Sequence, residues 1–175
     1  MSNDSFNTAI PPGVVSAETF ASVDGLEFLQ RIRDGRFPPP PIAALLGFYP
    51  IEVESGRAVF AARPDSRLYN PMGAIHGGYM ATLLDSCMGC AVHSKLKAGQ
   101  GYTTVELKVS YVRPLTEETG EVRAEGKIIH HGRQIATADG RLTDSRGRLL
   151  AHASTTCLIF NLPKPDVASS ESLQA

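Results

Sequence analysis

The chain has 175 residues, and 42% of them are hydrophobic, which is enough apolar surface for one domain with a substantial core. Lys and Arg number 17 and Asp and Glu 18, giving a net charge of -1 and an isoelectric point near 6.5. This balance argues against a nucleic-acid-binding protein and against a polybasic membrane-surface protein. No Lys or Arg precedes Arg31, three cysteines are too few for a disulfide framework, and no apolar stretch is long enough to span a membrane. We therefore expect a soluble, cytoplasmic protein.

The chain divides into four predicted segments. Residues 1–22 and 161–175 lack hydrophobic periodicity, which is typical of flexible tails. Residues 23–40 contain apolar side chains at helical spacing, followed by a proline-rich extended spacer. Residues 41–160 carry the remaining long hydrophobic segments, and we expect them to form the folded domain.

Within residues 41–160 the pattern predicts one long helix and six strands. Residues 77–97 contain no proline and place apolar side chains three and four positions apart, which indicates a buried helix. A short helical turn at 42–46 precedes it, and the predicted strands are 51–54, 57–62, 105–111, 121–129, 134–142 and 149–160. Residues 130–133 and 144–147 are predicted turns between the last three strands. The pattern predicts an α+β fold in which an antiparallel sheet wraps around one central helix.

The strand at 105–111 shows the clearest alternation. Val105, Leu107, Val109 and Tyr111 alternate with polar residues, which assigns these four side chains to the covered face of the sheet.

The residues from Tyr69 to Gly78 lead directly into the long helix and are rich in glycine. Glycine lets the backbone approach a ligand closely, and N–H groups in the first helical turn have no partner within the helix. Such a turn can bind an oxyanion or a phosphate. No Gly-Lys-Ser/Thr motif follows and no dinucleotide fingerprint is present, which favours a carbonyl oxygen over a nucleotide.

Asp85 is the single carboxylate in a stripe of small residues along the same helix, Gly78, Ala81, Thr82 and Gly89. An isolated carboxylate on an apolar helix lowers stability unless something uses it. The spacing alone leaves two interpretations open. Asp85 is either a catalytic group or a structural one that forms a salt bridge or caps a neighbouring loop.

Asn70, His76-Gly77-Gly78 and Asp85 at this spacing resemble the hot-dog-fold acyl-CoA thioesterases, in particular the phenylacetate-degradation and 4-hydroxybenzoyl-CoA thioesterase-like group. The resemblance extends from Pro41 to Phe160. It implies the hot-dog fold and the hydrolysis of acyl-CoA thioesters. The absence of a Gly-x-Ser-x-Gly motif agrees, because it disfavours an α/β-hydrolase.

The resemblance implies roles for five residues. The backbone N–H of Gly77 would bind the thioester carbonyl oxygen, with Asn70 and His76 shaping the loop or contacting the thioester. Asp85 matches the catalytic carboxylate, either as a general base on water or as a nucleophile that forms an acyl anhydride. Thr104 matches a hydroxyl that helps to hold the water. A thioester is already electrophilic, so an oxyanion donor and a base suffice without a catalytic triad.

Several of these residues have competing interpretations. Thr103, rather than its neighbour Thr104, is an alternative candidate for the hydroxyl that holds the water. His76 has a second interpretation, in which it only stabilises the start of the helix. Cys87-x-x-Cys90 with His93 has the form of a metal or redox motif, but small core residues are the favoured interpretation because no second ligand pair is present. We expect no metal.

The spacing of Gly77 and Asp85 predicts a shared active site. The two residues are eight positions apart on one helix, or about 12 Å at about 1.5 Å per residue. A donor and a base that serve one carbonyl must each come within roughly 3 Å of the reacting group or its water. We therefore expect Gly77 of one protomer to act with Asp85 of another in an obligatory homodimer. The side-by-side dimers of the resembled family, often paired into tetramers, agree and imply a dimer of dimers.

Coenzyme A would be part of the substrate, and no separate cofactor is expected. Arg133, His131 and Arg113 are the candidates for contacting its phosphates, with a solvated surface as the alternative. The acyl group is open: the resembled group favours an aromatic acyl, whereas a medium or long fatty acyl needs only a different pocket floor. Tyr79, Met80 and Leu83 are candidates either for that pocket or for the core.

Two other functions remain as alternatives. A hot-dog domain can bind acyl-CoA without hydrolysing it, as a sensor or carrier. A hot-dog hydratase is disfavoured, because its different arrangement of histidine and acid is absent from the sequence. The segment before Pro41 has no role in the resemblance, and a cap over the acyl tunnel is one role open to it.

Overall fold

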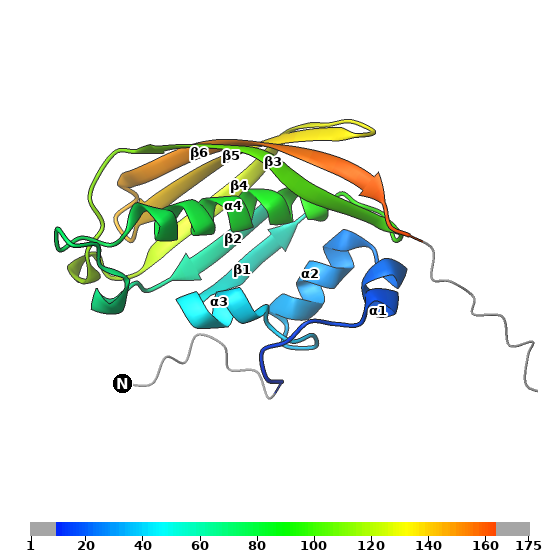
Figure 1. Cartoon of the computed structure of the whole chain (residues 1–175), viewed down its shortest axis with the longest axis horizontal. Helices are drawn as coiled ribbons and strands as arrows, with labels where there is room; N and C mark the ends of the chain where they lie inside the picture. Colours follow the sequence, from blue (N-terminus) through cyan, green and yellow to red (C-terminus); the bar gives the residue numbers. More distant parts are fainter. Residues whose placement is uncertain (1–9, 164–175) are drawn as a thin grey trace, which may run out of the picture.

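The structure, a computed structural model, describes residues 10–163, which form four helices and a six-stranded sheet (Figure 1). The helices are α1 (Ala17–Ser22), α2 (Gly25–Arg33), α3 (Pro41–Leu46) and α4 (Gly77–His93), with 3-10 turns at Ser66–Leu68 and Glu117–Thr119. The strands are β1 (Phe48–Glu54), β2 (Arg57–Ala62), β3 (Gln100–Tyr111), β4 (Val122–His131), β5 (Ile135–Asp144) and β6 (Leu149–Asn161). The predicted α+β fold is confirmed.

The sheet curves over α4, as Figure 1 shows. All its strand pairs are antiparallel, and the order β1-β2-β4-β5-β6-β3 makes β1 and β3 the two edges. Helix and sheet approach closely at Gly126 of β4, where a Cβ atom would lie 2.4 Å from the backbone carbonyl of Cys87. Only glycine fits there without a shift of the helix.

The core lies between α4 and the sheet. Tyr79, Met80 and Leu83 are buried in this core, which decides between the two positions that the sequence left open for them. Among residues 10–163, no helix combines the length and the apolar character that a membrane crossing requires.

β3 departs from strict alternation at Val105. Thr104 pairs with Cys157 and Glu106 pairs with Thr156, so Val105 is an extra residue in a bulge. Val105 is 57% exposed, and the prediction that it lies on the covered face is wrong. Because of the bulge, Thr104 contacts Asp85 of α4 while Leu107 and Val109 still pack against the core.

The predicted turn at residues 130–133 is displaced. His130 and His131 are the last residues of β4 and pair with Thr137 and Ala136 of β5. The strand pairing continues past a bulge after Ile128, where the register with β5 shifts by one residue. Both histidines are exposed, as expected for residues beyond the core.

Part of the segment predicted as an N-terminal tail is helical. Ser16 caps α1 by accepting a hydrogen bond from the N–H of Thr19 at 3.1 Å, and Phe20 packs edge-on against Phe28 of α2 at 5.1 Å. Tertiary packing of this kind stabilises helices too short to form alone. Residues 1–9 and 164–175 of the predicted tails lie outside the described residues.

His93, the last residue of α4, connects the N-terminal helices to the domain. Its ring centroid lies 5.4 Å from that of Phe20, 5.5 Å from Phe28 and 5.8 Å from Tyr102 of β3. The side chain is buried, and this burial lowers the pKa of His93 from 6.5 to about 4. Folding therefore favours the neutral form of the His93 imidazole.

We expect the protein to lose stability as the pH falls from 6.5 towards 4, because the unfolded chain binds a proton at His93 that the folded chain excludes. The contribution is fully present above the unfolded pKa and disappears towards the folded one. At about 1.4 kcal/mol per pKa unit, it amounts to about 3 kcal/mol of unfolding free energy. His93→Phe keeps the ring but cannot titrate. Its urea midpoint should fall less between pH 7.5 and 4.5 than that of the native protein; equal falls would contradict the prediction.

Candidate active site

Asn70 organises the loop that leads into α4. Its Oδ1 accepts hydrogen bonds from the N–H of Met72 at 2.9 Å and of Ala74 at 3.3 Å, and its own N–H donates to the Ala74 carbonyl at 2.7 Å. This local pattern is typical of Asn in tight turns. The resemblance implied that Asn70 either shapes the loop or contacts the thioester, and these hydrogen bonds are the loop-shaping kind.

His76 is the N-cap of α4. Its Nδ1 accepts from the N–H of Gly78 at 2.9 Å, and its carbonyl accepts from the N–H of Tyr79 at 2.9 Å. An accepting Nδ1 places the ring proton on Nε2. These bonds engage the second and third N–H groups of the helix. Among the described residues, the N–H of Gly77 has no acceptor, so it is the donor that this turn can offer to a ligand.

Tyr111, the last residue of β3, covers Gly77. Its hydroxyl donates to the Gly77 carbonyl at 3.0 Å, and a Cβ atom at Gly77 would lie 3.2 Å from the tyrosine ring. Alternation predicted a covered position for Tyr111, but the side chain is 51% exposed even though it contacts Gly77. Because β3 runs antiparallel to the direction of α4 in this region, the end of the strand meets the start of the helix.

Asp85 lies in the middle of α4 and faces β3. The hydroxyl of Thr104 donates to its Oδ1 at 2.9 Å. Within the described chain Asp85 forms no salt bridge, so the geometry does not support the structural interpretation in which it pairs with a base or caps a loop. Thr104, rather than Thr103, makes the contact. Its hydroxyl proton is directed at the carboxylate and its oxygen stays available as an acceptor.

A pocket of about 200 Å³, here called the Asp85 pocket, opens beside this carboxylate. Asp85 is the only charged side chain among the described residues that line it, and the wall is otherwise mostly apolar. Cys90 also lines it, but burial and the nearby Asp85 charge raise the pKa of the Cys90 thiol to about 12. That thiol is protonated near neutral pH and is a poor nucleophile. The pocket therefore points to carboxylate chemistry.

Sequence reasoning missed most of this pocket. Its wall comes from α2, α3, the spacer before α3, the first two strands, α4 and β3, so no local motif contains it. The lining residues are Leu29, Ile32, Pro40, Ile42, Ala43, Phe48, Pro50, Phe60, Asp85, Ser86, Cys90 and Tyr102.

The free Gly77 N–H and the Asp85 carboxylate are far apart within one chain. Gly77 and Asp85 lie on the single uninterrupted helix α4, which puts their backbones about 12 Å apart. Gly77 is covered by Tyr111 and Asp85 contacts Thr104. Within one protomer, the Gly77 N–H and the Asp85 carboxylate therefore have different neighbours.

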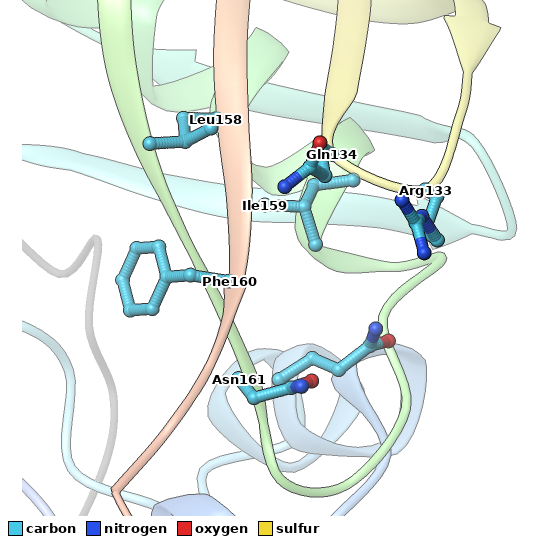
Figure 2. A pocket seen from close by; sticks show the side chains of 7 residues that line it. Arg133, Gln134, Leu158, Ile159, Phe160 and Asn161 are labelled. Carbon is cyan, nitrogen blue, oxygen red and sulfur yellow. The ribbon is translucent and has the colours of Figure 1, made fainter.

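Arg133 lies in the β4–β5 turn, beside a second pocket of about 400 Å³ (Figure 2). Figure 2 shows Arg133, Gln134 and Ile159 on one side of β6, with Leu158 and Phe160 pointing to the other. Among the described residues Arg133 forms no ion pair, so its charge is available to an anion. This pocket shares none of the described lining residues of the Asp85 pocket.

The three candidate phosphate contacts are not brought together in one chain. His131 and Arg133 lie at the end of the sheet where β3 begins, because Gln100 lines the Arg133 pocket. Arg113 follows the other end of β3, about 36 Å away along the strand, and donates to the Leu149 carbonyl at 2.5 Å.

Cys87, Cys90 and His93 of the Cys87-x-x-Cys90 pattern have different neighbours. The Cys87 thiol donates to the Leu84 carbonyl at 3.2 Å, and His93 stacks on aromatic rings. Within residues 10–163, no three His, Cys, Asp or Glu side chains are grouped as a metal site would require.

Comparison with known proteins gives consistent matches. The family described as the thioesterase superfamily matches residues 72–151. The proofreading thioesterase EntH of Klebsiella pneumoniae subsp. pneumoniae is 30% identical over 107 residues, which cover 61% of this chain and 77% of that protein. The 1,4-dihydroxy-2-naphthoyl-CoA hydrolase of Listeria monocytogenes is 21% identical over 114 residues, covering 65% of this chain and 91% of that protein. The crystal structure of a phenylacetic acid degradation-related protein from Ralstonia eutropha JMP134 superposes with a TM-score of 0.69 at 27% identity, covering 75% of this chain and 98% of that one.

The fold and these matches define a thioester hydrolase of the hot-dog class. More specifically, the chain belongs to the thioesterase superfamily. The fold and the enzyme class that the sequence resemblance implied are thereby confirmed. The catalytic roles of individual residues stay predictions.

Proposed function

We propose that the protein hydrolyses a coenzyme A thioester with an aromatic or a medium to long acyl chain, releasing the free acid and coenzyme A. The observation that carries this proposal is the position of Asp85, a lone carboxylate in an apolar pocket with one oxygen held by Thr104. A related protein that is named as a naphthoyl-CoA hydrolase supports coenzyme A as the leaving group.

The chemistry follows from the Gly77 N–H and the Asp85 carboxylate. In the general-base route, Asp85 takes a proton from water as the water oxygen attacks the thioester carbon, and the Gly77 N–H stabilises the oxyanion. Collapse of the intermediate breaks the carbon–sulfur bond, and the proton passes to the coenzyme A sulfur. In the nucleophilic route, an Asp85 oxygen attacks the same carbon, the thiolate leaves, and water then cleaves the anhydride. Both routes need the same residues.

We propose further that each active site joins Gly77 of one protomer to Asp85 of its partner. β3 is an unpaired sheet edge in the described chain, with Val105 57% and Tyr111 51% exposed along it. Pairing two such edges about a twofold axis would continue the sheet and run two α4 helices antiparallel. That arrangement would bring Gly77 of one protomer towards Asp85 of its partner, and two such dimers would form a tetramer.

Release of free thiol from a panel of coenzyme A thioesters tests the function. The panel contains phenylacetyl, hydroxybenzoyl and saturated acyl esters of increasing length. We expect turnover of at least one class, and the preferred ester names the acyl group. Binding of the esters without thiol release from any of them would instead establish an acyl-CoA-binding module.

A further inference from the structure

A second apolar pocket lies next to the Asp85 pocket and is lined by the N-terminal segment. This outer pocket, of about 460 Å³, is lined by nine residues between positions 13 and 40, and every one of them is apolar. Ile32 and Pro40 line both pockets, so their side chains form the boundary between the two. Figure 1 places α1 and α2, which supply part of the wall of the outer pocket, on the β1 side of the molecule.

The Asp85 pocket alone is small for a ligand site. Its volume of about 200 Å³ falls below the roughly 300–1,000 Å³ usual for small-molecule pockets, whereas the two pockets together fall within that range. No side chain that lines the outer pocket can hydrogen-bond to a phosphate, an amide or a hydroxyl. A hydrocarbon chain can occupy such a pocket without leaving a polar atom unpaired.

We propose that the N-terminal segment, residues 13–40, sets the acyl-chain specificity, and that the substrate is a long, unbranched fatty acyl thioester whose tail passes Ile32 and Pro40 into the outer pocket. The inference rests on the proposed reaction at Asp85. All the lining residues of the outer pocket precede residues 72–151, the part that matches the thioesterase superfamily. The aromatic pair Phe20 and Phe28, at 5.1 Å, stiffens the far wall.

Two variants should shift the chain-length preference in opposite directions. Val15→Trp fills the outer pocket from its partly exposed rim, so the chain length at which binding stops improving should become shorter. Ile32→Ala widens the passage, so longer chains should gain relative to short ones. Glu18→Trp adds the same bulk on the exposed side of α1, outside both pockets, and is the matched control.

Binding of hydrolysis-inert alkyl-coenzyme A thioethers with chains of increasing length gives the readout, beside thiol release from the matching thioesters. In the native protein, affinity should rise about fourfold for each methylene that enters the outer pocket. Val15→Trp should lose this gain and Glu18→Trp should keep it. Identical chain-length profiles for Val15→Trp, Glu18→Trp and the native protein would overturn the inference.

The two proposals fail in different ways. If the protein releases thiol but Val15→Trp has the native chain-length profile, the role of the outer pocket is rejected and the hydrolase activity stands. If no ester releases thiol but Val15→Trp shortens the preferred chain length in binding, the hydrolase proposal is rejected. The outer pocket then stands as a fatty acyl binding site.

Discussion

Asp85→Asn is expected to lower kcat for thioester hydrolysis by about two to four orders of magnitude, the range typical for loss of a general base. The amide neither accepts a proton from water nor forms an anhydride, so both routes at this residue stop. Because asparagine has nearly the same shape and its oxygen can still accept from the Thr104 hydroxyl, substrate binding should persist. Thiol release under saturating ester measures the loss.

The control for this variant is Asp139→Asn, which removes an exposed carboxylate of β5 that lies outside the Asp85 pocket. It should retain native kcat. Circular dichroism and the elution volume of the assembly then show whether Asp85→Asn keeps its fold and oligomeric state. A correctly folded Asp85→Asn protein with native kcat would mean that Asp85 is structural and that another group activates water.

The elements of the hot-dog domain were predictable because their signals are local. Periodicity places α4, and the glycine at position 47 ends α3 in a left-handed conformation with φ of 68°. Pairing between strands is not local. The bulge at Val105 depends on how β3 registers with β6, and alternation within one strand cannot reveal it.

The site divides in the same way. His76, Gly77 and Asp85 are spaced along one helix, so their relative positions follow from the sequence. The Asp85 pocket and α1 depend on contacts between distant segments, such as the packing of Phe20 on His93, which no pattern in residues 1–22 signals. Arg113 and Arg133 could not be placed relative to each other, because their distance depends on the strand order.

Gly77→Pro is expected to lower kcat by about two to three orders of magnitude, as removal of one oxyanion donor does in other hydrolases. Proline at the first helical position removes the N–H and keeps the helix, since this is the position that helices tolerate best. His76, with φ of -59° and ψ of 135°, already has the extended conformation that a following proline requires. The matched control is Gly77→Ala, which adds the same Cβ near Tyr111 but keeps the donor. Equal loss in both variants would assign the effect to crowding against Tyr111.

The same two variants test whether the site is shared. If Gly77 of one protomer serves Asp85 of its partner, a heterodimer of Gly77→Pro and Asp85→Asn chains contains one intact site and one site with both defects. Random pairing in a twofold dimer then restores about a quarter of the native activity from two nearly inactive proteins. Co-expression with two affinity tags allows the doubly tagged heterodimer to be isolated, and this species should show about half of the native activity, because one of its two sites is intact. Activity no higher than that of the separate variants would place both groups in one chain, and the 12 Å spacing along α4 would then have to be spanned within a single protomer.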